Sequence, residues 1–173
     1  MDYDDQDTDL TPLWLETAPE ENSFRSILKW GDKQAFKNPS KGFLKVIKQE
    51  LNLTDADFEA MENIGNRTVK SSLPVNVSKA DLADLEKIVG RKNFSIVVYD
   101  RLKYAKGKAM EDIMGLRREQ VKDICDVVVH PRDKQDVKAI VSLCHDQKIP
   151  VHVYGGGSSV TFGLDCPRGG VTL

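Results

Sequence analysis

The hydrophobic positions in the last third of the chain follow the order strand, helix, strand. The β-branched run Val127–Val129 is followed closely by Pro131, which predicts a short buried strand. From Asp133, whose carboxylate suits an N-cap, apolar residues recur at the spacing of an amphipathic helix. A second apolar run, from Ile149 to Tyr154, predicts another strand. Together these elements form a βαβ unit, for which a right-handed crossover is expected.

The spacing also predicts how the helix of this unit is oriented. The residues expected to face the sheet are Val137, Ile140, Val141 and Cys144, and those expected to face water are Lys134, Lys138 and Asp146. The predicted fold class is therefore α/β in this segment and α+β over the whole chain, because the preceding residues show mainly helical patterns.

Short helices are predicted upstream of this unit. Apolar residues at helical spacing follow Gly42, and Thr54 and Ser78 each suit an N-cap, with an aspartate three positions later. Gly90 is placed to end the helix that begins after Ser78. Because this region has few apolar residues for a core of its own, we expect it to pack against another part of the chain.

The residues between 94 and 118 show two patterns. Ile96, Val97 and Val98 are three apolar, β-branched residues in a row, which favours a strand over residues 94–99. From Asp100 onward, apolar residues alternate with many charged ones, and we expect two helices divided near Gly107.

Composition narrows the class of protein. The formal net charge of the 173 residues is −2, so the chain shows no basic surface of the kind that binds nucleic acid or anionic membranes. No apolar run is long enough to span a bilayer, and the N-terminus lacks a signal-peptide pattern. The first 21 residues hold eight acids and no Lys or Arg, which predicts a solvated acidic tail over residues 1–21.

The strongest chemical signal is the run of three glycines and two serines after the second predicted strand. Three residues without Cβ allow a sharp turn and let a ligand lie against the backbone. Consecutive N–H groups in such a turn can converge on an anion, and serine hydroxyls add donors. A phosphate or pyrophosphate is the natural ligand, although neither the Rossmann nor the P-loop spacing is present. The alternative is a flexible turn between two strands.

Other residues carry weaker signals. Arg101 and Arg117 either pair with nearby acids on a solvated helix face or reach toward a phosphate, for which a guanidinium is well suited. The three histidines share no metal-ligand spacing, so no metal site is predicted. The three cysteines are odd in number and are expected to be reduced thiols; Cys166, in a loop, is a weak candidate for a catalytic thiol.

The order strand, helix and Gly-Gly-Gly-Ser-Ser resembles the start of the FAD-binding domain of the vanillyl-alcohol oxidase type. Within that superfamily the chain is similar to the alkyldihydroxyacetonephosphate synthase family. The matching segments are Leu28–Gly31, Asp100–Arg101, Gly107–Lys108, Leu116–Arg117 and Gly163–Pro167. The resemblance treats residues 94–99 as a linker into a helix that begins near Asp100, an alternative to the strand. Val153 stands where the relatives usually have proline, which leaves the extended conformation of the loop accessible.

The resemblance implies a domain organisation and a cofactor site. After the acidic tail over 1–21, which follows from composition, it predicts an N-terminal helical region over 22–120 and the incomplete first part of an FAD-binding domain over 121–173. FAD is the implied cofactor, and its pyrophosphate would be held by Val153, Tyr154, Gly155, Gly156, Gly157, Ser158 and Ser159. The family's second flavin-binding half and its cap have no counterpart in this sequence, so no catalytic residue is assigned.

The resemblance also implies an activity for the intact enzyme. The family exchanges the acyl group of acyl-dihydroxyacetone phosphate for a fatty alcohol, with no net redox change, in ether lipid biosynthesis. Two alternatives remain, namely part of another FAD-linked oxidase or dehydrogenase of 2-hydroxy acids, and a stand-alone phosphate-ligand module without catalysis. We expect the chain alone to be inactive and cytoplasmic, with a peroxisomal location if it comes from an animal-type source. Assembly into a homo-oligomer is left open.

Overall fold

The computed structural model describes residues 18–28, 40–59, 65–70 and 73–173. The predicted acidic tail lies almost entirely outside these residues. Three residues of the segment Leu28–Gly31 also lie outside them.

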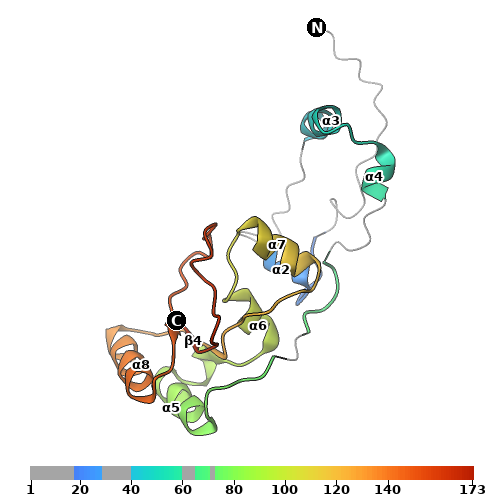
Figure 1. The fold of residues 1–173 in the computed structure, drawn as a ribbon. Helices are drawn as coiled ribbons and strands as arrows, with labels where there is room; N and C mark the ends of the chain where they lie inside the picture. The colour runs from blue at the N-terminus through green and yellow to red at the C-terminus, as the bar shows by residue number, and fades with distance from the viewer. Residues whose placement is uncertain (1–17, 29–39, 60–64, 71–72) are drawn as a thin grey trace.

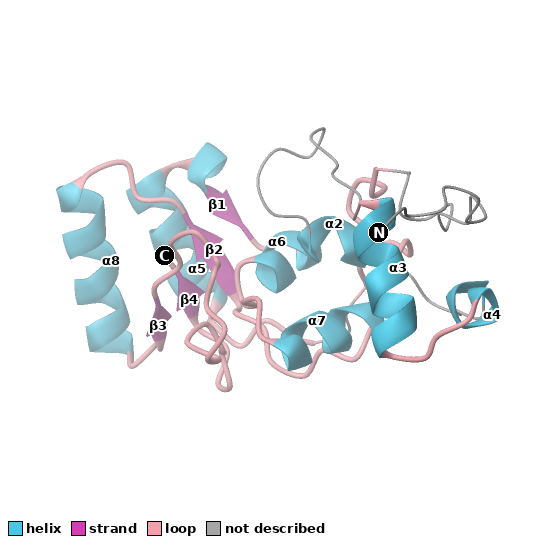
Figure 2. Ribbon diagram, turned by 90° about the horizontal axis from the view of Figure 1, so that it is seen from above, coloured by secondary structure: helices cyan, strands magenta, loops and turns pink. Residues whose placement is uncertain are grey.

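A four-stranded mixed sheet forms the centre of the fold. Its strands are β1 (Phe94–Ser95), β2 (Val127–Val129), β3 (Val151–His152) and β4 (Val171–Thr172), in the order β1-β2-β4-β3. β1 pairs antiparallel with β2, whereas β4 is parallel to both β2 and β3. The predicted strand–helix–strand unit is present, but β4 lies between its two strands (Figure 2).

Helix α8 (Lys134–Gln147) connects β2 to β3 and begins as predicted. The Asp133 carboxylate accepts hydrogen bonds from the backbone N–H groups of Gln135 and Asp136, at 2.8 and 3.0 Å. The predicted face is only partly correct. Ile140 and Cys144 are buried, but Val137 is 37% exposed and Val141 is 47% exposed. The expected water-facing residues are all exposed, namely Lys134, Lys138 and Asp146.

The buried face of α8 differs from the predicted face because α8 packs against a second helix. Helix α5 (Lys79–Val89) lies beside α8 and covers the same face of β2 (Figure 2). The buried residues of this layer are Leu85, Val89, Val127, Val129, Ile140, Cys144 and Val171. The predicted caps of α5 are confirmed: the Ser78 hydroxyl accepts from the Asp81 N–H at 3.1 Å, and Gly90 follows the helix with a φ of 82°.

Three short helices pack on the opposite side of the sheet. They are α2 (Phe24–Leu28), α6 (Val98–Lys103) and α7 (Met110–Arg117). Successive strand residues point to opposite faces, so Val128 contributes to this second core while its neighbours contribute to the first. Its other buried members are Phe24, Ile27, Val69, Leu102, Ala105, Leu116, Ile124, Cys125 and Cys166.

These helices settle the two patterns predicted for residues 94–118. Only Phe94–Ser95 is a strand, and α6 begins at Val98, so the linker is confined to residues 96–97 and the helix begins two residues before Asp100. The predicted division near Gly107 is confirmed, because α6 ends before it and α7 begins after it. The expectation that the upstream helices pack against another part of the chain is confirmed for α5, which contacts β2.

Helices α3 (Lys41–Glu50) and α4 (Asp55–Glu59) lie apart from the α/β body in Figure 1. A short 3₁₀ turn, η1 (Arg91–Asn93), joins α5 to β1. The predicted domain boundary at residue 120 stays a prediction. α5 and β1 lie before this residue, and both belong to the layers around the sheet. Among the described residues, no helix has the length and apolarity needed to cross a membrane.

Candidate functional site

The glycine loop leaves the sheet directly after β3. The Tyr154 N–H donates to the Leu173 carbonyl at 2.9 Å, which extends the pairing of β3 with β4 by one step. Gly155 to Gly157 then turn away from the sheet. The loop therefore starts at the carboxyl ends of parallel strands, where ligands of open α/β sheets generally bind.

The backbone of this loop offers unused hydrogen-bond donors. Within the described part of the chain, no amide N–H from Gly155 to Ser159 donates to another group. Gly155 and Gly156 are exposed, and a Cβ built on either would meet no atom within 4 Å. Free amides beside open space fit an anion such as a pyrophosphate, because each N–H can donate to a phosphate oxygen.

Gly157 has a different role from its two neighbours. It is buried with a φ of +67°, and a Cβ there would lie 2.5 Å from the Tyr154 Cζ atom. Only glycine adopts this conformation so close to a ring without strain. Tyr154 in turn meets Tyr104 edge-on at 4.9 Å, and Tyr104 meets His130 at 5.2 Å. Burial raises the pKa of Tyr154. The loop is thus anchored through Tyr154 to a row of rings.

Ser159 shapes the far end of the loop. Its hydroxyl oxygen accepts from the Gly163 N–H at 3.0 Å, and its carbonyl accepts from the Lys108 N–H at 2.6 Å. Ser158 and Val153 are exposed, Val153 to 72%. Of the seven predicted site residues, Gly155 and Gly156 lie beside open space, Val153 and Ser158 are exposed, and Tyr154, Gly157 and Ser159 organise the loop.

The turn 106–108 holds the loop from the side. Gly107 lies against the backbone of Ser159, and the Lys108 ammonium donates to the Ile27 carbonyl at 2.9 Å. Burial lowers the pKa of Lys108. The Lys106 ammonium lies 3.1 Å from Asp165, which follows the loop. The sequence indicated Gly107–Lys108 only through the family resemblance. It gave no sign of their contact with Ser159, because residues about 50 positions apart carry no local signal of a contact.

The phosphate-binding alternative for Arg101 is wrong. Its guanidinium is buried and donates to three backbone carbonyls, those of Cys125 at 2.8 Å, Leu73 at 3.2 Å and Pro74 at 2.8 Å. Arg101 therefore ties α6 to the start of β2 and to the segment before α5. Burial lowers the pKa of Arg25, and the positive charge of nearby Arg117 lowers it further. For Arg117 the phosphate-binding alternative stays a prediction.

The cysteines are structural. All three are free and buried. The contact with Cys125, together with burial, raises the pKa of Cys166, so this thiol is unsuited to act as a nucleophile. Burial raises the pKa of Cys144 to about 11. In the described part of the chain, no cluster of His, Cys, Asp and Glu could hold a metal ion.

A buried carboxylate fixes the turn before β4. Asp126 accepts from the Asn76 N–H at 2.9 Å and from the Gly170 N–H at 2.8 Å. A Cβ on Gly169 would lie 2.9 Å from the Asp126 carboxyl carbon, and Gly169 has a φ of +66°. This turn places β4 between β2 and β3, and thereby sets the position of the strand end from which the glycine loop departs.

Comparison with known proteins identifies the segment that carries the loop. Residues 125–173 match the family model described as FAD binding domain. The chain is 25% identical over 130 residues to alkyldihydroxyacetonephosphate synthase of Trypanosoma brucei brucei, covering 73% of this chain and 21% of that protein. It is 39% identical over 51 residues to the mitochondrial D-lactate dehydrogenase [cytochrome] of Arabidopsis thaliana, covering 30% of this chain and 9% of that protein.

A solved structure of an alkyldihydroxyacetonephosphate synthase has the same fold. It superposes with a TM-score of 0.55 at 23% identity, over 58% of this chain and 21% of the synthase chain. The chain thus spans about a fifth of the length of the synthases it matches. Residues 125–173 match an FAD binding domain, and 73% of the chain is similar to part of an alkyldihydroxyacetonephosphate synthase.

Proposed function

We propose that this chain, which carries part of an FAD binding domain of the alkyldihydroxyacetonephosphate synthase type, holds the pyrophosphate of FAD in its glycine loop. The observation that supports the proposal most directly is the run of amides from Gly155 to Ser159 that donate to no other group, with open space beside Gly155 and Gly156. The loop also lies within the segment that matches the family model. When bound, FAD supplies the chemistry, and the residues of this chain bind and orient it.

The activity of the whole protein would be that of an alkylglycerone-phosphate synthase. Such an enzyme exchanges the acyl group of acyl-dihydroxyacetone phosphate for a fatty alcohol. The extent of the similarity supports this choice. The match to the trypanosomal synthase covers 130 residues, so it extends well beyond the 49 residues of the FAD binding segment. The match to the lactate dehydrogenase covers 51 residues and is little longer than that segment.

The second candidate is an FAD-linked dehydrogenase of 2-hydroxy acids. It is favoured by one observation, the higher identity of 39% to the plant D-lactate dehydrogenase. Both candidates use the same flavin site, so the loop cannot distinguish between them. A longer form of the protein would do so by transfer of a labelled fatty alcohol to acyl-dihydroxyacetone phosphate, measured beside flavin reduction by D-lactate.

The flavin site itself can be tested on the 173-residue chain. We expect weak binding, because a row of amides contacts only the pyrophosphate while the flavin and adenine rings need apolar walls. The purified chain should therefore be colourless. Backbone N–H signals of Gly155 to Ser159 should nevertheless shift in a nuclear magnetic resonance titration with millimolar FAD.

Two aspartate variants make this titration specific. Gly156→Asp places a carboxylate in the open space beside the amides, and the loop signals should no longer shift. Gly42→Asp introduces the same charge at an exposed position of α3 and should leave the titration unchanged. Unaltered FAD shifts in Gly156→Asp would overturn the assignment. Saturable quenching of flavin fluorescence at micromolar FAD would show that the chain is sufficient for tight binding.

A further inference from the structure

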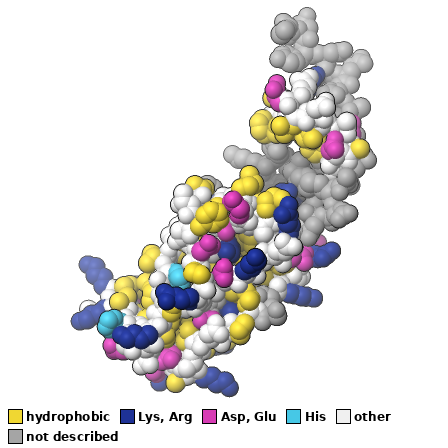
Figure 3. Space-filling model, in the orientation of Figure 1, with side chains coloured by type: hydrophobic (Ala, Val, Ile, Leu, Met, Phe, Trp, Pro, Cys, Tyr) yellow, Lys and Arg dark blue, Asp and Glu magenta, His cyan; other side chains and the backbone are white. Residues whose placement is uncertain are grey.

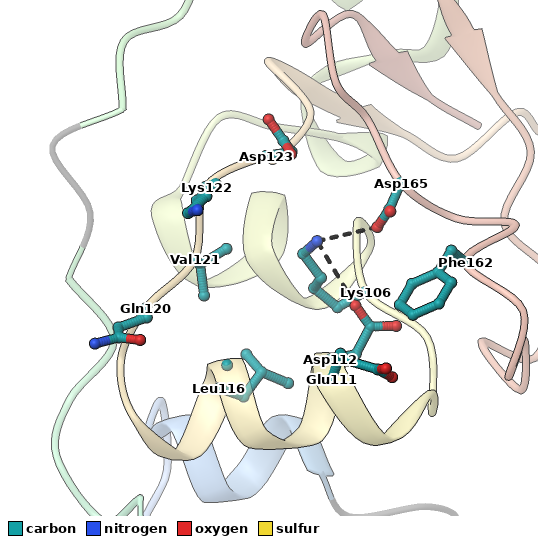
Figure 4. Close-up of a pocket in the computed structure, with 11 residues that line it drawn as sticks. Lys106, Glu111, Asp112, Leu116, Gln120, Val121, Lys122, Asp123, Phe162 and Asp165 are labelled. Atoms are coloured by element: carbon teal, nitrogen blue, oxygen red, sulfur yellow. Dashed lines mark hydrogen bonds and ion pairs between the residues drawn. The ribbon is translucent and has the colours of Figure 1, made fainter.

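A cavity of about 330 Å³ is lined in part by Phe162 and Asp165, which follow the glycine loop in the chain. It is partly open to solvent and is bordered by α7, the segment 120–123 and the loop 162–165 (Figure 4). The volume is in the range of small-molecule sites. Leu116, Val121 and Phe162 supply apolar lining, and the polar lining consists of Lys106, Glu111, Asp112, Gln120, Lys122, Asp123 and Asp165.

One buried oxygen in this lining has no partner. The Asp112 side chain is only 5% exposed, and its Oδ1 atom lies 3.7 Å from the Lys106 ammonium. Its Oδ2 atom is buried and accepts no hydrogen bond in the described part of the chain. In Figure 4 the carboxylate points into the space between Lys106 and Phe162. A buried carboxylate oxygen without a donor is costly, so a donor from outside the chain would be favoured there.

The charges around this oxygen restrict what that donor can be. Four carboxyl groups and two ammonium groups line the cavity, and Lys106 is shared between Asp112 and Asp165. In Figure 3 acidic and basic side chains lie together in the region of α7. The excess of negative charge in the lining disfavours an anion such as a phosphate ester and favours a cation.

We propose that the cavity binds a small molecule with a primary ammonium group, which donates to Asp112 Oδ2 while its carbon chain packs on Phe162 and Leu116. An amino alcohol of two to four carbons has this chemistry. The site is independent of the FAD site, because none of its lining residues belongs to Gly155–Ser159. It lies close to that loop through Phe162 and Asp165, which follow the loop in the chain.

The test is a nuclear magnetic resonance titration of the full 173-residue chain with three probes of equal size class. Ethanolamine carries the ammonium group, ethylene glycol carries only hydroxyls, and ethyl phosphate carries an anion. With ethanolamine we expect saturable shifts of the backbone signals of Glu111–Leu116 and Phe162–Asp165. Ethylene glycol should bind at least tenfold more weakly, and ethyl phosphate should not bind. Equal binding of ethylene glycol and ethanolamine would refute the ammonium, and binding of the phosphate would refute the charge argument.

Two variants assign the binding to the proposed atoms. Asp112→Asn keeps the side-chain volume but removes the acceptor charge, and should weaken ethanolamine binding at least tenfold. Phe162→Asn leaves the Lys106–Asp112 pair intact and removes the apolar wall; asparagine suits the φ of 59° at this position. Phe43→Asn, on the exposed face of α3, is the matched control. Absence of ethanolamine shifts in the folded parent, or unchanged affinity in both cavity variants, would mean that water alone satisfies Asp112 and would overturn the proposal.

Discussion

Replacement of Gly107 by alanine should displace the glycine loop from a position outside it. A Cβ on Gly107 would lie well inside 3.0 Å of the Ser159 carbonyl oxygen, 3.2 Å from its carbonyl carbon and 3.3 Å from its Cβ. The obstructing atoms are backbone, so no side-chain rotation relieves the clash. Either Ser159 or the 106–108 turn must move, and the hydrogen bond from the Lys108 N–H to the Ser159 carbonyl is lost.

The cost can be worked out from these two effects. Overpacking of a well-packed site costs about 1–3 kcal/mol. Loss of the hydrogen bond adds about 0.5–1.5 kcal/mol. We therefore expect a decrease of roughly 2–4 kcal/mol in the free energy of unfolding, which corresponds to a fall in Tm of roughly 5–15 °C for a chain of this size. Urea denaturation followed by circular dichroism measures the first quantity and a thermal melt the second.

Two control variants separate stability from ligand binding. Gly155→Ala adds a methyl group where no atom lies within 4 Å, so it should leave the stability unchanged and weaken only the FAD-induced shifts. Gly42→Ala adds a methyl group to the exposed surface of α3 and should stabilise the helix by up to about 1 kcal/mol. If Gly107→Ala unfolds like the parent and its Ser159 signal stays in place, the turn 106–108 does not hold the loop.

Three further predictions concern the core and its charges. Ile140→Asp should cost about 3–5 kcal/mol because it buries an unpaired carboxylate, whereas Val141→Asp should cost little; equal losses in thermal melts would contradict the observed face of α8. Hydrogen bonds from Arg132 lower the pKa of Asp136 to about 2, below its unfolded value of about 3.9, so the advantage of the parent over Asp136→Asn should be full above about pH 5 and be lost as the pH falls through about 2; a pH-independent difference in urea melts would refute this. Because Cys144 has a pKa of about 11 and all three thiols are buried, iodoacetamide at pH 8 should label none in the native chain and three after unfolding, as counted by mass spectrometry.

The sequence predicted those parts of the fold that depend on local pattern. The caps at Ser78 and Asp133, the division near Gly107 and the β-branched strand at Val127–Val129 need only neighbouring residues, and all are present. The orientation of α8 was partly wrong because it depends on α5, about 50 residues earlier. Periodicity marks an apolar stripe but cannot tell which part of it a distant helix covers.

The site shows the same limit. The glycine loop could be found from the local sequence alone, since three successive glycines before two serines are a recognisable motif. Its supports could not be, because Lys106 and Lys108 are ordinary charged residues until the fold brings them to Asp165 and Ile27. Arg101 was misjudged for a related reason. An arginine on a polar helix suggests a free guanidinium, and only the fold shows three carbonyls converging on it.

The contacts of the loop extend beyond the segment that matches the FAD binding domain. That segment begins at residue 125, yet the Ser159 carbonyl is held by Lys108, and the Lys108 ammonium is held by the Ile27 carbonyl. The Tyr154 ring rests on Tyr104, at the end of α6. A preorganised anion site needs its amides fixed before the ligand arrives, because ordering them on binding would cost conformational entropy. The helices before residue 120 therefore supply rigidity to the glycine loop, and a shortened chain of residues 125–173 would keep its amides but lose their fixed arrangement.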